Sequence, residues 1–307
     1  MYNETNGMMN NKRKGIILML VFAFSLAVQT VLLKKAGHIP VAEKTVYRNS
    51  IAALFAFFYI AKTRGFKNNR AMFFGTKKNI LGLSLRSLFG IVGITLNLYA
   101  LQYLLVPNAT MIQDLSIFFV IIFSYIFLGE KVKLWQIFLI CVGFIGAIFV
   151  VDPDSSKFVL VPSIAALIGA AMNGGDSATM RYLGDKCDPV TVVFFYNFVS
   201  SIILLPFMII YYKHLSLHTT IYLILAGLCY IIVEFSLITA YKYAPARDIA
   251  LFRYTDVIFS AILAFFVWGK LPSTTNVIGY VIIAVAAILL LLYKNPTSDS
   301  KKVSSRT

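Results

Sequence analysis

Apolar stretches of helical length recur along the chain, and polar or proline-containing breaks separate each one from the next. At a rise of 1.5 Å per residue, about 20 apolar residues cross a ~30 Å hydrocarbon core as an α-helix. The pattern predicts ten membrane-spanning helices, at residues 15–34, 44–62, 79–101, 107–128, 133–151, 159–181, 190–211, 219–241, 246–268 and 274–293. The predicted fold class is therefore an all-α integral membrane protein with ten transmembrane helices.

The composition supports this fold class. Of the 307 residues, 59% are hydrophobic and 13% are charged, and the mean hydropathy is +0.79, whereas roughly 25% of the residues of a soluble domain are charged. The first apolar stretch is long enough to remain in the membrane as a helix, so we expect no cleavable signal peptide.

The net charge of +15 would suggest a nucleic-acid partner if the protein were soluble. Most of the lysines and arginines, however, fall in the loops predicted for one side of the membrane. The positive-inside rule assigns that side to the cytoplasm. We therefore expect a multi-pass protein of the cell (inner) membrane with both termini in the cytoplasm, in contact with the lipid bilayer and with no nucleic acid.

The stretches 99–130 and 239–270 resemble each other without a gap. One alignment matches four landmarks: Ala100 with Ala240, Tyr103 with Tyr243, Phe119 with Phe259, and Gly129 with Gly269. The match predicts two halves of five helices, and because five is odd, the second half enters the membrane from the opposite side. Such inverted repeats are the layout of secondary transporters. The predicted divisions are a cytoplasmic tail at 1–12, repeats at 13–152 and 157–294, a linker at 153–156 and a disordered tail at 295–307.

The two copies differ where they are polar. Gln113 and Asp114 align with Arg253 and Tyr254, and Ser116 aligns with Asp256. The shared positions therefore predict architecture, and the unshared ones predict that the two halves contribute different chemistry to a site.

The five-helix halves, the tyrosine-containing turn before the fourth helix of each half and the ending Leu128-Gly129-Glu130 resemble the EamA-type carriers of the drug/metabolite transporter superfamily. The resemblance extends over residues 13–294. It implies a ten-helix metabolite transporter with a central cavity lined mainly by the first, third, fourth, sixth, eighth and ninth helices. One position departs from symmetry, because Lys270 stands where the first half has Glu130.

Ionisable residues inside the predicted spans are candidates for the site, because a charge at the bilayer centre costs about 2.5–3.5 kcal/mol on insertion scales. These residues are Arg48, Arg86, Asp114, Asp176, Glu234, Arg253 and Asp256. Four acids nearly balance three bases, which also fits structural ion pairs. Arg253 and Asp256, three apart on one predicted helix, are placed to meet directly. Asp114 either contacts a substrate amine or a proton, or pairs with Arg86 or Arg48.

Several other polar residues accompany these charges in the predicted spans. Tyr230 is four residues before Glu234 and should project from the same side of its helix. Asn173 precedes Asp176 by three residues, and between them Gly174 and Gly175 either allow close helix packing or break the helix beside a polar cavity.

Gln113 neighbours Asp114 and joins the candidate site. For Arg48 and Arg86 the structural alternative is that their long side chains reach the membrane interface.

Other functional classes lack sequence support. The three cysteines, Cys141, Cys187 and Cys229, are far apart, so neither a disulfide framework nor a zinc site is expected. No nucleotide-binding glycine loop or catalytic triad pattern occurs. We therefore expect no enzyme, no cofactor and no metal.

The sequence predicts a secondary active transporter that moves a small polar organic metabolite, such as an amino acid, an amine or a related zwitterion. It would work by alternating access, with proton coupling or by exchange against a counter-substrate. One alternative is an exchanger of organic anions or nucleotides that uses Arg48, Arg86 and Arg253. Another is a membrane sensor or assembly subunit that transports nothing. Monomer and homodimer both remain open.

Overall fold

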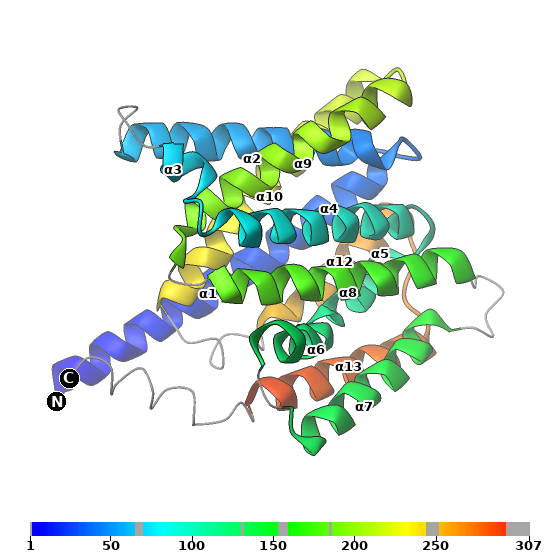
Figure 1. Cartoon of the computed structure of the whole chain (residues 1–307). Helices are drawn as coiled ribbons and strands as arrows, with labels where there is room; N and C mark the ends of the chain where they lie inside the picture. The colour runs from blue at the N-terminus through cyan, green and yellow to red at the C-terminus, as the bar shows by residue number, and fades with distance from the viewer. Residues whose placement is uncertain are drawn as a thin grey trace.

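The computed structural model describes residues 2–64, 70–129, 132–152, 159–183, 186–243 and 252–292. Every regular element within these residues is a helix, which confirms the all-α class (Figure 1). The helices are α1 (Tyr2–Lys35), α2 (Val41–Arg64), α3 (Arg70–Phe74), α4 (Ile80–Tyr103), α5 (Val106–Asp114), α6 (Ser116–Leu128), α7 (Leu134–Val151), α8 (Leu160–Leu183), α9 (Pro189–Ile210), α10 (Leu217–Tyr243), α12 (Thr255–Trp268) and α13 (Thr274–Leu292).

Six segments of the described chain are long and apolar enough to cross a membrane. They are Arg13–Lys35, Ile80–Tyr103, Val106–Phe127, Leu134–Val151, Pro189–Ile210 and Leu217–Ala240. Thr255–Trp268 and Thr274–Leu290 are shorter apolar helices. The predicted spans in α2 and α8 do not reach this hydropathy, because α2 carries Arg48 and Asn49 and α8 carries Asn173 and Asp176.

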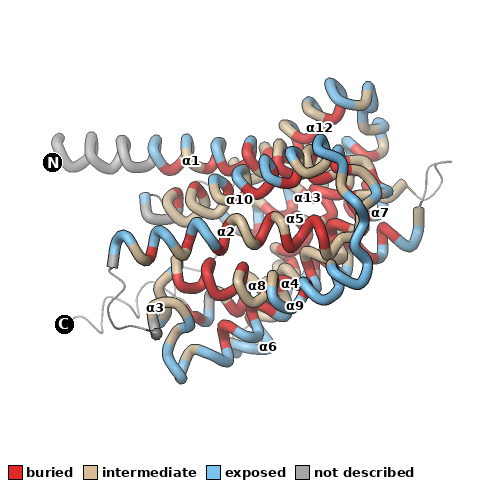
Figure 2. The backbone as a smooth tube through the Cα atoms, turned by 90° about the horizontal axis from the view of Figure 1, so that it is seen from above, coloured by how far each residue is buried: buried red, intermediate tan, exposed pale blue. Residues whose placement is uncertain are grey.

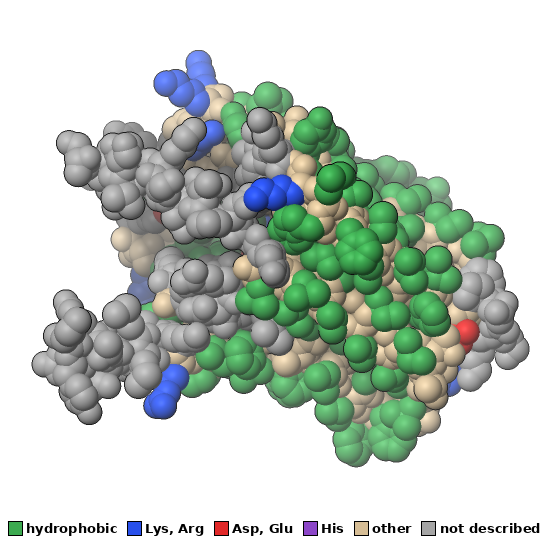
Figure 3. Space-filling model, turned by 90° about the horizontal axis from the view of Figure 1, so that it is seen from below, with side chains coloured by type: hydrophobic (Ala, Val, Ile, Leu, Met, Phe, Trp, Pro, Cys, Tyr) green, Lys and Arg blue, Asp and Glu red, His purple; other side chains and the backbone are tan. Residues whose placement is uncertain are grey.

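The outer surface of the molecule is strongly apolar. Large side chains such as Phe266, Leu81 and Phe58 are 79%, 70% and 66% exposed. Hydrophobic side chains cover most of the described face in Figure 3, and most of the visible lysines and arginines lie in its left half. Buried residues collect where the helices face one another (Figure 2). Because soluble monomers rarely expose apolar patches of this extent, this surface fits a lipid environment.

Glycines allow a close helix contact between α4 and α8. A Cβ added to Gly169 would lie 3.1 Å from the carbonyl oxygen of Gly93, so the two backbones touch. Gly175 faces the ring of Phe89 in α4, and Gly174 faces α6. The helix α8 runs unbroken through both of these glycines. The predicted alternative of a break at this point is therefore wrong, and close packing is the role of the pair.

The helix breaks lie instead in the fourth and ninth predicted spans. The helix α5 ends at Asp114, and α6 begins at Ser116 after a turn at Leu115. Later in the chain, a turn at Tyr254 precedes α12. At both turns the backbone forms a hydrogen bond between residues three apart, as in a 3₁₀ helix. The N–H of Phe118 donates to the carbonyl oxygen of Leu115, and the N–H of Val257 donates to that of Tyr254.

The half-helices α6 and α12 then end alike. Each is capped by a glycine, Gly129 or Gly269, with φ of +64°, in the left-handed region that glycine adopts without strain. The predicted spans 107–128 and 246–268 were expected to be continuous, and each is interrupted by a turn next to charged residues.

Candidate functional site

The two helix breaks bring together three charged side chains from opposite ends of the sequence. Arg253 Nε lies 3.7 Å from Asp114 Oδ1, and α5 packs against α12. Asp256, in the first turn of α12, is fully buried, and Asp114 is 4% exposed. The carboxyl groups of Asp114 and Asp256 are close enough to share a hydrogen bond. We call Asp114 and Asp256 the carboxyl pair.

The carboxyl pair lacks donors. Within the described residues, Asp114 Oδ2 and both side-chain oxygens of Asp256 are buried with no N–H or O–H group at good hydrogen-bonding geometry. Two carboxylates cannot bond to each other, because neither has a proton to give. The arrangement becomes satisfied when one carboxyl group is protonated or when a cation with N–H donors binds between the two.

The pairing of Arg253 differs from the sequence prediction. Asp114 was expected to pair with Arg86 or Arg48, and this is wrong, because its partner is Arg253. Arg253 and Asp256 were expected to share one helix, but the turn at Tyr254 separates them. Asp256 still lies within the electrostatic field of Arg253.

A second group of charges lies among α2, α4, α8, α9 and α10. Arg86 Nε is 3.4 Å from Asp176 Oδ1, and its Nη1 donates to the carbonyl oxygen of Val192 at 3.2 Å. The Arg86 guanidinium also lies over the ring of Tyr196, with 4.8 Å between Cζ and the ring centre. Glu234 is close enough to act electrostatically on both Arg86 and Asp176. We call Arg48, Arg86, Asp176 and Glu234, with Tyr196 and Tyr230, the balanced cluster.

Arg48 joins the balanced cluster through an aromatic ring. Its Cζ lies 3.9 Å from the ring centre of Tyr230, which is a close cation–π contact. The Tyr230 hydroxyl donates to Glu234 Oε1 at 2.7 Å, so the prediction that these two side chains project together is confirmed. Arg48 and Arg86 are 5% and 4% exposed, which contradicts the alternative that they reach the membrane interface.

A small hollow lies between α1, α2, α4 and α5, with a volume of about 50 Å³. Its polar lining comes from Gln29, Thr30, Arg48, Asn97, Thr110 and Gln113. Sequence reasoning found Arg48 and Gln113 but missed Gln29 and Asn97, because a neutral amide inside an apolar stretch carries no charge signal. Asn173, by contrast, packs against Gly93 at the contact of α4 with α8 and is not among the residues that line the hollow.

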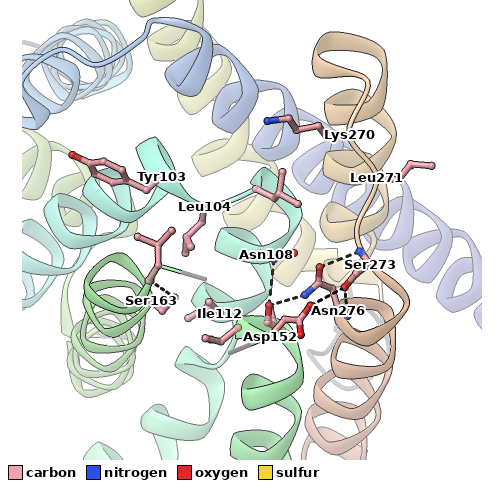
Figure 4. Close-up of a pocket in the computed structure, with 14 residues that line it drawn as sticks. Tyr103, Leu104, Asn108, Ile112, Asp152, Ser163, Lys270, Leu271, Ser273 and Asn276 are labelled. Carbon is pink, nitrogen blue, oxygen red and sulfur yellow. Dashed lines mark hydrogen bonds between the residues drawn. The ribbon is translucent and has the colours of Figure 1, made fainter. Parts of the chain in front are cut away.

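A larger groove of about 420 Å³ lies at the ends of α4, α7 and α12 (Figure 4). Asn276 Nδ2 and Asn108 Nδ2 donate to the Val150 carbonyl at 2.9 and 3.2 Å, and Ser273 Oγ donates to Asp152 Oδ2 at 3.3 Å. These amide, hydroxyl and carboxylate groups bond to one another, whereas the amino group of Lys270 and the hydroxyl of Tyr103, which also line the groove, make no hydrogen bond within the described residues.

Two remaining predictions concern a metal site and Glu130. No group of three or more His, Cys, Asp or Glu side chains suited to a metal ion occurs in the described part of the chain. Glu130, which the family resemblance singled out, lies outside the described residues.

Comparison with known proteins agrees with this architecture. A model of the EamA-like transporter family matches residues 13–152 and again residues 161–292. The pseudopaline exporter CntI of Pseudomonas aeruginosa is 25% identical over 283 residues, which cover 91% of this chain and 96% of the exporter. The S-adenosylmethionine uptake transporter of Rickettsia prowazekii is 28% identical over 225 residues, which cover 72% of this chain and 75% of that protein.

A solved crystal structure shares the fold, with a TM-score of 0.61 and 15% sequence identity over 93% of this chain and 99% of the other. The two family matches together span most of the 307 residues, in a chain whose described helices are apolar and whose relatives are transporters. The chain therefore belongs to the EamA-like transporter family of the drug/metabolite transporter superfamily, and it is a multi-pass membrane transporter and not an enzyme.

Proposed function

We propose that this protein is a proton-coupled secondary transporter of a small polar organic metabolite, an amino acid, amine or related zwitterion, across the cytoplasmic membrane. The observation that carries the proposal is the carboxyl pair, Asp114 and Asp256, buried at two helix breaks beside a single arginine. Both termini are proposed to face the cytoplasm.

Alternating access requires two related halves, and the helix contacts support such a division. If the two halves are related, α1, α2, α4, α6 and α7 correspond to α8, α9, α10, α12 and α13. The contact of α4 with α8 then corresponds to that of α10 with α1, and both contacts are present. The same correspondence relates α6–α8 to α12–α1 and α2–α10 to α9–α4, while α2–α9 and α7–α13 map onto themselves. The matching caps at Gly129 and Gly269 fit the same relation. We propose inverted five-helix repeats at 13–152 and 157–294 in a ten-helix protein.

The carboxyl pair supplies a reason for cation coupling. The charged groups that face each carboxyl are the other carboxyl and Arg253, within the part of the chain that the structure describes. Two buried carboxylates beside one guanidinium leave a net negative charge that water does not screen. One proton neutralises this charge and supplies the missing hydrogen bond between the carboxyl groups.

A substrate ammonium group is able to replace the proton, since it brings a positive charge and N–H donors. Proton and substrate then compete for one site. The carrier moves the substrate in one direction and returns with the proton in the other. The relatives fit this class of substrate, because S-adenosylmethionine carries an α-amino and an α-carboxylate group.

The anion-exchanger alternative finds less support. It uses Arg48, Arg86 and Arg253, and two of these three arginines, Arg86 and Arg253, each lie against a carboxylate of the protein.

The test is uptake of radiolabelled S-adenosylmethionine and amino acids into liposomes that contain the purified protein, with and without an imposed pH gradient. Asp114→Asn and Asp256→Asn should each abolish accumulation driven by the gradient, while exchange of labelled for unlabelled substrate continues. Asp152→Asn is the matched control, because this carboxylate lies in the groove away from the pair, and it should behave as wild type. Full dependence on the gradient in both pair variants would contradict the proposal.

A further inference from the structure

We infer that the small hollow between α1, α2, α4 and α5 is the binding site for the carboxylate group of the substrate, and that Arg48 is the residue that holds it. This inference rests on the proposed transport function and narrows its substrate class to amino carboxylates. It is carried by the contacts of Arg48 and by the unpartnered amides around it.

Arg48 is the buried arginine of the site that has no carboxylate within ion-pairing distance, among the residues that the structure describes. Arg86 and Arg253 each have one. The contacts of Arg48 are a hydrogen bond from Nε to Asn49 Oδ1 at 2.9 Å and the ring of Tyr230. Within the described residues its two terminal amino groups, Nη1 and Nη2, donate to no protein acceptor, so they are available to a ligand.

Asn49 and Tyr230 hold the side chain of Arg48 in place. Asn49, which accepts from Arg48 Nε, itself donates to Ser200 Oγ at 2.8 Å, and both Asn49 and Ser200 are fully buried. The ring of Tyr230 is fixed by its hydroxyl bond to Glu234. A guanidinium held in this way loses little conformational freedom when it binds a planar carboxylate through two parallel N–H···O bonds.

The rest of the lining is suited to the same group. Gln29 Oε1 and Asn97 Nδ2 are buried without a hydrogen-bond partner in the described residues, and their residues are 2% and 7% exposed. An amide nitrogen that lacks an acceptor is satisfied by a carboxylate oxygen. Gln29 Oε1 needs a donor, which the ammonium or another N–H group of the same substrate supplies.

The size and charge of the hollow favour a carboxylate over a phosphate. One water needs roughly 10–15 Å³ by the same measure of volume, so about 50 Å³ holds the few atoms of a carboxylate head group. The hollow has a single cationic side chain, Arg48, which matches a single negative charge. The other polar lining residues are neutral amides and threonines.

Both the hollow and the carboxyl pair use residues of α5. Gln113 lines the hollow, and Asp114, the next residue of α5, lies outside its lining. In the proposed binding mode, a substrate with its carboxylate on Arg48 extends its ammonium group out of the hollow toward Asp114. Different parts of the protein then bind the two charged ends of an amino acid: Arg48 binds the carboxylate, and the carboxyl pair binds the ammonium group.

The experiment measures binding to the purified full-length protein in detergent, by thermal shift and then by calorimetric titration. The ligands are the standard L-α-amino acids, each compared with its own α-carboxamide, which has the same shape without the negative charge. At least one amino acid should bind, and its carboxamide should bind about 10- to 100-fold more weakly, the range for loss of one charge-assisted bond. Arg48→Gln should bind the amino acid as weakly as wild type binds the carboxamide.

Two further variants keep the test informative if Arg48→Gln folds poorly. Arg48→Lys keeps the charge without the planar fork and should retain part of the preference for the free acid. Asn97→Asp is isosteric and places a carboxylate in the hollow, so it should compete for Arg48 and remove the preference. Lys213→Gln, an exposed charge outside the hollow, is the control and should bind as wild type.

Three results would overturn the inference: carboxamides that bind as tightly as the acids, a preference for acids that survives in Arg48→Gln and Asn97→Asp, or no binding by any amino acid. Its failure is distinct from failure of the proposed function. Uptake of amines driven by a pH gradient would leave proton coupling standing and remove the carboxylate site. Binding of acids through Arg48 with uptake that ignores the gradient would do the reverse.

Discussion

The carboxyl pair and the balanced cluster are both groups of charges enclosed by the helices, and they differ in their charge balance. The balanced cluster has two arginines and two acids, and the ring of Tyr196 or Tyr230 lies against each guanidinium. The carboxyl pair has two acids with a single arginine, Arg253, beside it, and three of its oxygens lack a donor within the described residues.

The two groups also differ in their backbone. Arg86 and Asp176 lie on the unbroken helices α4 and α8, whereas Asp114 and Asp256 adjoin the turns at Leu115 and Tyr254. Arg86 and Asp176 neutralise each other across two helices, whereas Arg48, in the same cluster, keeps the free Nη1 and Nη2 groups that we propose for a substrate carboxylate. The Arg86–Asp176 pair therefore suits a structural role, and the carboxyl pair, with its excess of negative charge, is the group to which we assign the proposed proton coupling.

The largest expected effect comes from unpairing the balanced cluster. Arg86→Gln leaves Asp176 without its charge partner and should lower the free energy of unfolding by about 3–5 kcal/mol, the usual cost of breaking a buried ion pair. Denaturant titration of the purified protein in detergent measures this change. The double variant Arg86→Gln with Asp176→Asn removes the stranded charge and should recover most of the loss. Equal losses in the single and double variants would mean that the pair is not structural.

An intermediate effect should follow from removing one hydroxyl group of the balanced cluster. Tyr230→Phe keeps the ring beneath Arg48 but deletes the hydrogen bond to Glu234, and a bond to a charged group contributes about 1.5–3 kcal/mol. Tyr222→Phe is the control, because this ring also lies beside a cation, Lys35, and its hydroxyl makes no hydrogen bond within the described residues. If both variants lost the same stability, the hydroxyl bond of Tyr230 would have no special part in the cluster.

The smallest effect on stability should come from the carboxyl pair itself. Asp256→Asn removes one of two like charges, supplies N–H donors to Asp114 and leaves the contact of Asp114 with Arg253 in place. We expect a change in the free energy of unfolding below about 1 kcal/mol, since an unfavourable like-charge contact is exchanged for a hydrogen bond. A loss as large as that of Arg86→Gln would show that both groups are structural and would end the contrast between them.

The sequence predicted the parts of the fold that depend on local pattern. The length of the apolar stretches located the long described helices but not the short helix α3, and the cost of burying charge selected the charged residues that the structure places in the two groups. The pairing of Asp114 with Arg253 was beyond reach, because it depends on two helix breaks that no proline or glycine marks at Leu115 or Tyr254. The glycines of α8 allowed two interpretations, a helix break or close packing, because both favour small residues. The structure shows packing against α4 and α6. Gln29 and Asn97 became visible only when neighbouring helices were seen to enclose a hollow around them.

The contact of Gly93 with Gly169 restricts how the protein is able to change shape. Because these backbones touch, α4 cannot slide or tilt relative to α8 without opening a void or a clash. The contact thus joins two helices that come from different halves of the sequence. In the alternating access that we propose, the chain would bend at the turns at Leu115 and Tyr254. Asp114 and Asp256 adjoin these turns, so bending there would change the distance between the two carboxyl groups.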